Sequence, residues 1–202
     1  MKTILPLLAV MFLAISVPTV RADTITYDTG LNGTSESPVN TSLGKGVAIL
    51  TINTMTQTIE VNVTFSGLET GDTATLIHCC TATPGAGNAD VATTTPNFPE
   101  FPVAVTSGSY DQIFDLTASS TYNPAFVTAE GSVANAEAAL LAGLADGEAY
   151  LNIHTTAFPG GEIRGFFPAN AAVPAPEPSS LWLLGFGLLA LVSATKLKSL
   201  AS

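Results

Sequence analysis

The sequence predicts an all-β fold, a Greek-key β-sandwich with one short crossover helix, from three observations. Apolar Ile59, Val61 and Val63 alternate with polar residues, as in a strand with one buried face. Similar short segments, rich in β-branched and aromatic residues and separated by Gly- and Pro-containing turns, span residues 46–53, 58–68, 73–79, 107–117, 148–155 and 161–167. Only residues 135–147 show helical spacing of leucines, ending at a glycine suited to a C-cap.

The amino-terminal segment 1–22 predicts a secretory signal peptide. It starts with Lys2, continues with a short apolar run and closes on small residues, so cleavage is expected between Ala22 and Asp23. About 14 apolar residues are too few to span a bilayer, which disfavours a permanent anchor. The chain then divides into a signal peptide, a domain over 23–168 and a carboxyl-terminal segment over 169–202.

The charge of the chain excludes one class of function. It carries 16 acidic and 6 basic residues, and Lys45 and Arg164 are the only basic residues between Asp23 and Glu177. Nucleic-acid binding requires a basic face, so we expect no nucleic-acid partner. The acids are scattered without a calcium-loop motif, a pattern typical of a solvated surface.

The carboxyl-terminal segment has three parts: a short motif, an apolar stretch over 181–195, and the basic residues Lys196 and Lys198. The motif consists of Pro176, Glu177, Pro178 and Ser179. This order resembles the PEP-CTERM sorting signal of Gram-negative bacteria. The resemblance implies transient membrane insertion through 181–195, processing by an exosortase after secretion, and delivery to the cell envelope, outer surface or extracellular matrix. Exopolysaccharide of a biofilm matrix and envelope proteins are the partners it suggests.

The segment 150–167 concentrates the polar residues of the domain. If it forms a hairpin in which Thr155 faces Gly161, a single face carries Asn152, His154, Glu162 and Arg164. We expect Glu162, Arg164 and His154 to form a charge-assisted network that stabilises the hairpin.

Catalytic residues cannot be nominated, because there is no G-x-S-x-G elbow and no prominent carboxylate pair. The alternative function is a metal-binding or redox protein in which His78, His154, Cys79 and Cys80 bind Cu or Zn. After export, the adjacent cysteines could equally form a vicinal disulfide, form an intermolecular bridge, or remain as buried thiols.

Three stretches resemble the CHRD domain, first noted in chordin: "LNGTSESPVNTSLGKGVAIL", "TATLIHCCTATPGAG" and "GEAYLNIHTTAFPGGEIRGFF". Leu76 stands where the family has the first histidine of an H-I-H motif, so a paired-histidine site is half missing. The resemblance implies an extracellular β-domain of undefined activity. The leading hypothesis is therefore a non-enzymatic exported protein of the cell surface or extracellular matrix, without a required cofactor.

Overall fold

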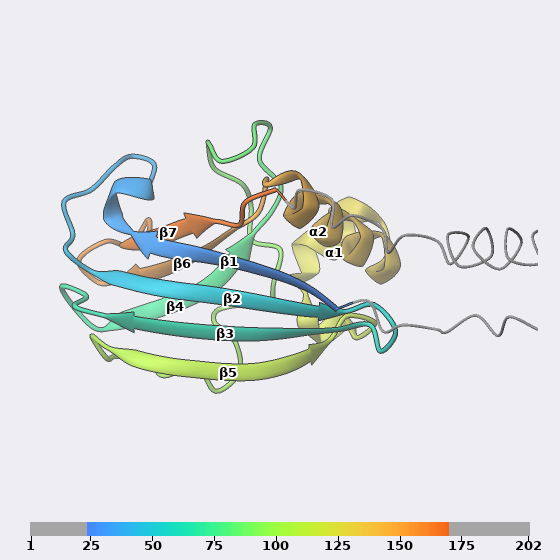
Figure 1. Cartoon of the computed structure of the whole chain (residues 1–202), viewed down its shortest axis with the longest axis horizontal. Coiled ribbons are helices and arrows are strands. Elements are labelled where there is room, and N and C mark those ends of the chain that lie inside the picture. The colour runs from blue at the N-terminus through green and yellow to red at the C-terminus, as the bar shows by residue number, and fades with distance from the viewer. Residues whose placement is uncertain (1–23, 170–202) are drawn as a thin grey trace, which may run out of the picture.

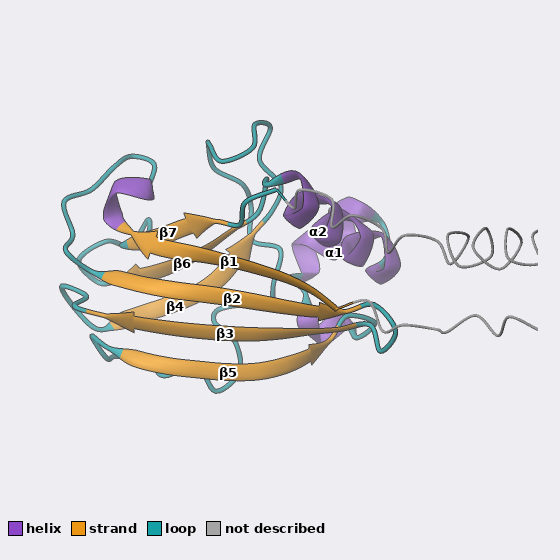
Figure 2. Cartoon of the chain, in the orientation of Figure 1, coloured by secondary structure: helices purple, strands orange, loops and turns teal. Residues whose placement is uncertain are grey.

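The computed structural model describes residues 24–169, and one seven-stranded sheet dominates them. In sheet order the strands are β4 (Asp72–His78), β6 (Tyr150–Thr155), β7 (Ile163–Phe166), β1 (Thr24–Asn32), β2 (Lys45–Asn53), β3 (Thr58–Ser66) and β5 (Gly108–Asp115). Every neighbouring pair is antiparallel. The sheet curls so strongly that β4 and β6 pass behind β1, β2 and β3 (Figures 1 and 2). The predicted all-β class is confirmed, with one continuous sheet curled into a sandwich-like shape.

Two α-helices, α1 (Pro124–Glu130) and α2 (Val133–Asp146), lie together at one end of the sheet (Figure 2). The expected helix corresponds to α2, which starts after the N-cap Ser132. The sequence analysis missed α1, although Asn123 caps it and a proline occupies its first turn. Two short 3-10 turns, η1 (Gly33–Ser35) and η2 (Ser119–Thr121), complete the described elements.

The strands β2 and β3 form the hairpin that their period-2 pattern predicts. Their pairing is continuous from Lys45↔Ser66 to Asn53↔Thr58, and residues 54–57 make the turn. Along β3 every second side chain is buried, which directs its apolar residues to the inner face of the curled sheet.

The central strand β1 was not predicted. Its inner face has only Tyr27 and Leu31 buried, and Thr29 between them interrupts the apolar pattern. Nine consecutive pairs with β2 nevertheless hold it in the sheet. Backbone pairing therefore stabilises a segment whose side chains give a weak strand signal.

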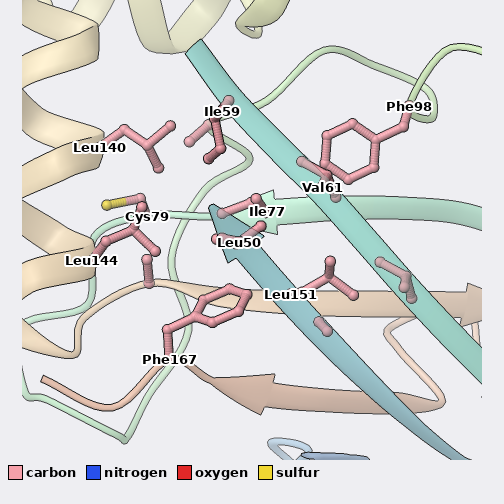
Figure 3. Close-up of a cluster of buried hydrophobic side chains, with 14 of the residues drawn as sticks. Leu50, Ile59, Val61, Ile77, Cys79, Phe98, Leu140, Leu144, Leu151 and Phe167 are labelled. Carbon is pink, nitrogen blue, oxygen red and sulfur yellow. The ribbon is translucent and has the colours of Figure 1, made fainter. Parts of the chain in front are cut away.

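The core lies inside the curl and extends to the helices. Figure 3 shows Leu50 and Val61 from the front strands facing Ile77 and Leu151 from the strands behind. The helix α2 closes the open end of the curl with its buried leucines, among them Leu144. This single core buries aliphatic side chains from both halves of the sheet, which is the main stabilising contribution.

The long connection between β4 and β5 is part of this structure. Its backbone amides donate to carbonyls on the free edge of β4, in the pairs Ala92–Ile77, Phe98–Thr75 and Ala104–Asp72. Phe98 and Phe101 are buried in the core, and Tyr110 of β5 donates to the Pro99 carbonyl. The connection thus covers an edge that would otherwise expose unpaired backbone groups.

Candidate functional site

The hairpin of β6 and β7 has the predicted register. Asn152 pairs with Arg164, and the Glu162 amide donates to the Ile153 carbonyl at 2.8 Å. On the core face, Leu151, Ile153 and Ile163 are fully buried. The opposite, outer face is also covered, by η1 with the residues that follow it and by loop residues 88–90.

The expected network between Glu162 and Arg164 does not form. The carboxylate of Glu162 accepts hydrogen bonds from Ser42 Oγ at 2.6 Å, from the Glu69 amide at 2.7 Å and from Thr155 Oγ1 at 2.7 Å. Glu162 precedes the first residue of β7 and follows Gly161, whose φ of 126° is a conformation favoured by glycine. This turn directs Glu162 away from the face that carries Arg164, so the strand alternation assumed from the sequence does not hold there.

Arg164 forms a second buried cluster with residues from distant loops. Its Nε donates to the Ser35 carbonyl and lies 3.7 Å from Glu36 Oε2, while one Nη donates to Asn88 Oδ1 at 2.8 Å. The guanidinium carbon lies 4.7 Å from the centroid of the Tyr150 ring. With 3% of Arg164 exposed, these contacts bind η1 and the β4–β5 connection to the sheet.

Glu36 is 5% exposed, and the pKa of its carboxyl is strongly shifted. Burial raises its pKa to about 7, against the opposing effects of Arg164 and of a hydrogen bond from the Ser37 amide. Its Oε1 has no hydrogen-bond partner. Glu36 therefore changes charge near neutral pH beside a permanently charged arginine.

The two histidines meet on the outer face. The ring of His78 stacks on Tyr150 with a centroid distance of 4.8 Å, and its centroid is 5.9 Å from that of His154. Nδ1 of His78 bonds to the Ala89 carbonyl at 2.9 Å, and Nδ1 of His154 bonds to the Pro159 carbonyl at 3.0 Å. Because a carbonyl only accepts, each Nδ1 carries a proton, and a neutral ring with its proton at Nδ1 has its lone pair at Nε2.

His78 is only 8% exposed. Burial lowers the pKa of His78 below its usual 6.5, and repulsion from His154 and Arg164 adds to this effect, while the Ala89 hydrogen bond and Asp90 oppose it. The His78 ring is therefore neutral at pH 7.

The cysteines form the intramolecular vicinal disulfide, one of the three alternatives left open by the sequence. Cys79 packs in the core and Cys80 is exposed beside a cleft of about 830 Å³ between α1 and residues 88–91. A β-carbon added at Gly143 of α2 would collide with both sulfurs, so this glycine permits the disulfide to contact the helix.

As an alternative, the sequence predicted a metal site made of His78, His154, Cys79 and Cys80. The disulfide removes the two cysteines from this set of ligands. Both sulfurs are in a covalent bond, so neither is a thiolate that could bind Cu or Zn. Among residues 24–169, no group of three or more histidine, cysteine, aspartate or glutamate side chains is arranged to hold a metal ion. Of the four predicted metal ligands, the imidazoles of His78 and His154 remain.

The sequence analysis did not nominate several residues of the two buried clusters, although Glu36 and Ser42 lie in the first stretch that resembles the CHRD domain. Glu36, Ser42 and Asn88 lie in irregular segments, more than 70 residues from the side chains they contact. Strand periodicity cannot identify such residues, because their contacts depend on how the loops cross the outer face.

The curled antiparallel sheet, with its covered outer face and buried charged clusters, defines an all-β domain built around polar as well as apolar contacts. The chain belongs to the CHRD-domain family, since the model of the CHRD domain matches residues 27–167. The model of the PEP-CTERM protein-sorting motif matches residues 174–196. No match was found among curated proteins or solved structures.

The PEP-CTERM motif implies processing by an exosortase and export to the cell envelope or surface. The cleavage site Ala22–Asp23, the motif residues 176–179 and the expected inserted segment 181–195 lie outside the described residues. Within residues 24–169, no helix is long and apolar enough to cross a membrane.

Proposed function

We propose that the chain is a non-enzymatic protein of the outer surface or extracellular polysaccharide matrix, processed and released by an exosortase. After processing, the CHRD domain remains at the surface, and the carboxyl-terminal sorting signal is removed. The observation that supports this proposal most is the pairing of a CHRD domain with a sorting motif that begins seven residues after it.

The arrangement of the charged residues supports a non-enzymatic role. The three hydrogen bonds accepted by the Glu162 carboxylate and the contacts of Arg164 hold loops against the sheet. Both side chains are at most 3% exposed, and so neither is presented to a substrate in solution. We infer that these groups stabilise the domain, and that its acidic surface keeps it soluble and self-repelling outside the cell.

Sorting is tested by following the full chain in a host with an exosortase. The mature surface protein is expected to begin at Asp23 and to lack residues 181–195, as intact-mass spectrometry would measure. Replacing Pro176, Glu177 and Pro178 by alanine should leave the carboxyl end intact and the protein in the membrane fraction. The control Pro168→Ala changes an exposed proline outside the matched residues 174–196 and should be processed normally. An intact carboxyl end on the mature wild-type protein would instead indicate a permanent anchor.

A further inference from the structure

The two histidines of the outer face have a property that their structural contacts do not explain. Each holds its Nδ1 on a backbone carbonyl, yet Nε2 of His78 and Nε2 of His154 are both buried without a hydrogen-bond partner. Buried polar atoms are nearly always paired, and Asn152, which lies between the two histidines in the strand pairing, has a third buried atom without a partner, Oδ1, so unpaired polar atoms gather here. A backbone hydrogen bond at Nδ1 is also the arrangement that orients metal-binding histidines.

The hydrogen bonds of the two Nδ1 atoms go to loops on opposite sides of the histidine pair. His78 is the last residue of β4 and bonds to the loop at its end, while His154 lies near the end of β6 and bonds to the loop at that end. Since β4 and β6 are antiparallel, these loops lie at opposite ends of the strands. Since the two nitrogens of an imidazole ring point in roughly opposite directions, each Nε2 is expected to face the space between the rings.

The distance between the rings suits one shared metal ion. A metal–nitrogen bond of about 2.0–2.1 Å places the ion about 3.2 Å from the centroid of an imidazole ring. Two imidazoles on one ion then have centroids about 5.2 Å apart at a tetrahedral angle and about 6.4 Å apart in a linear arrangement. The observed 5.9 Å lies between these limits and corresponds to a wide N–metal–N angle.

The surroundings select an ion of low charge and low coordination number. Leu76 pairs with Asn152 across the strands between the two histidines, so one of the two flanking positions is apolar and the other offers only a neutral amide. Arg164, over the Tyr150 ring on which His78 stacks, adds positive charge nearby, and the Asp90 carboxylate opposes it with a smaller effect on His78. Zn²⁺ takes four ligands, whereas the described residues provide two nitrogens here.

We propose that His78 and His154 bind a single Cu(I) ion through their Nε2 atoms, in a two-coordinate site closed off by the loops that bear Ala89 and Pro159. Imidazole is a ligand that suits copper, and a monovalent ion tolerates both the missing ligands and the nearby guanidinium. This site uses neither the sorting segment nor the sulfurs of the disulfide as ligands.

The test uses Ag(I), a redox-inert monovalent ion with the same preference for two ligands. Isothermal titration of the full chain should show one equivalent bound and a rise in melting temperature that increases with Ag(I) concentration. Imidazole ¹⁵N spectra should show Nε2 of both histidines shifting, with Nδ1 changing little. This spectroscopic result requires no substitution and so does not depend on whether a variant folds.

His154→Gln, at a half-buried position, should abolish the bound equivalent, and His78→Gln should do the same if it folds. Met55, whose thioether is 57% exposed, is another soft group that could attract Ag(I), so Met55→Leu is the matched control and should retain binding. The proposal is overturned if His154→Gln keeps the equivalent, if Met55→Leu removes it, or if Zn²⁺ stabilises the protein as much as Ag(I).

Discussion

Glu162 offers the sharpest test of how this domain is held together. Its buried carboxylate joins three segments: the residues before β2 through Ser42, the turn after β3 through the Glu69 amide, and the β6–β7 hairpin through Thr155. Glu162→Ala would remove both oxygens that accept these three hydrogen bonds, at a position with no exposed area. The Thr155 hydroxyl, on a residue that is 1% exposed, would then lose its acceptor inside the protein.

The expected loss follows from these hydrogen bonds. A hydrogen bond to a charged group contributes about 1.5–3 kcal/mol, and three that share one carboxylate are not additive. We therefore expect Glu162→Ala to lower the free energy of unfolding by about 3–5 kcal/mol, more than one such hydrogen bond contributes and less than three would if they were additive. For a domain of this size, that corresponds to a fall in melting temperature of roughly 10 °C.

Glu162→Gln refines the test. Its Oε1 could still accept from Ser42 and the Glu69 amide, and its Nε2 could donate to Thr155 Oγ1 if that hydroxyl turns. The loss should then be about 1–2 kcal/mol. Thermal and urea unfolding followed by circular dichroism would measure both variants, with the exposed Asp111→Ala as a control for the lost negative charge. If Glu162→Ala unfolds within about 1 kcal/mol of that control, the carboxylate does not join these segments.

Three further substitutions probe the rest of the molecule by thermal unfolding. Arg164→Ala should cost about 3–5 kcal/mol, because it leaves Glu36 buried without its cation; a loss below about 1 kcal/mol would mean that the cluster is solvated. Folded protein binds a proton at Glu36 up to about pH 7 while unfolded protein releases it near 4.5, so stability falls as pH rises. Between pH 6 and 8, the free energy of unfolding of the wild type should fall by on the order of 1 kcal/mol or less relative to Glu36→Gln, solvent screening included. Parallel pH profiles of the two proteins would exclude this role of Glu36. Gly143→Ala should cost about 1–3 kcal/mol through collision with the disulfide, whereas Gly30→Ala, which meets no atom, should not destabilise; equal effects would contradict the close contact with α2.

The local parts of the fold were predictable because their interactions lie close in sequence. The β2–β3 hairpin and the pairing of Asn152 with Arg164 depend on strand alternation and a short loop, both of which are visible in the residues. The helix α2 was predictable from its leucine spacing and terminal glycine, whereas the short α1 was missed. The all-β class followed from the same periodicity.

By itself, the sequence determined the all-β class, the hairpin register and the presence of a sorting motif, since each depends on neighbouring residues. Only the tertiary structure decided which charged groups meet. Gly161 rotates Glu162 away from Arg164, and the pairing of β1 with β7 brings Glu36, which follows β1 and η1, to that arginine instead. The two histidines lie 76 positions apart and approach because β4 pairs with β6. Such contacts depend on the closure of long loops over a sheet, which the pattern of neighbouring residues does not encode.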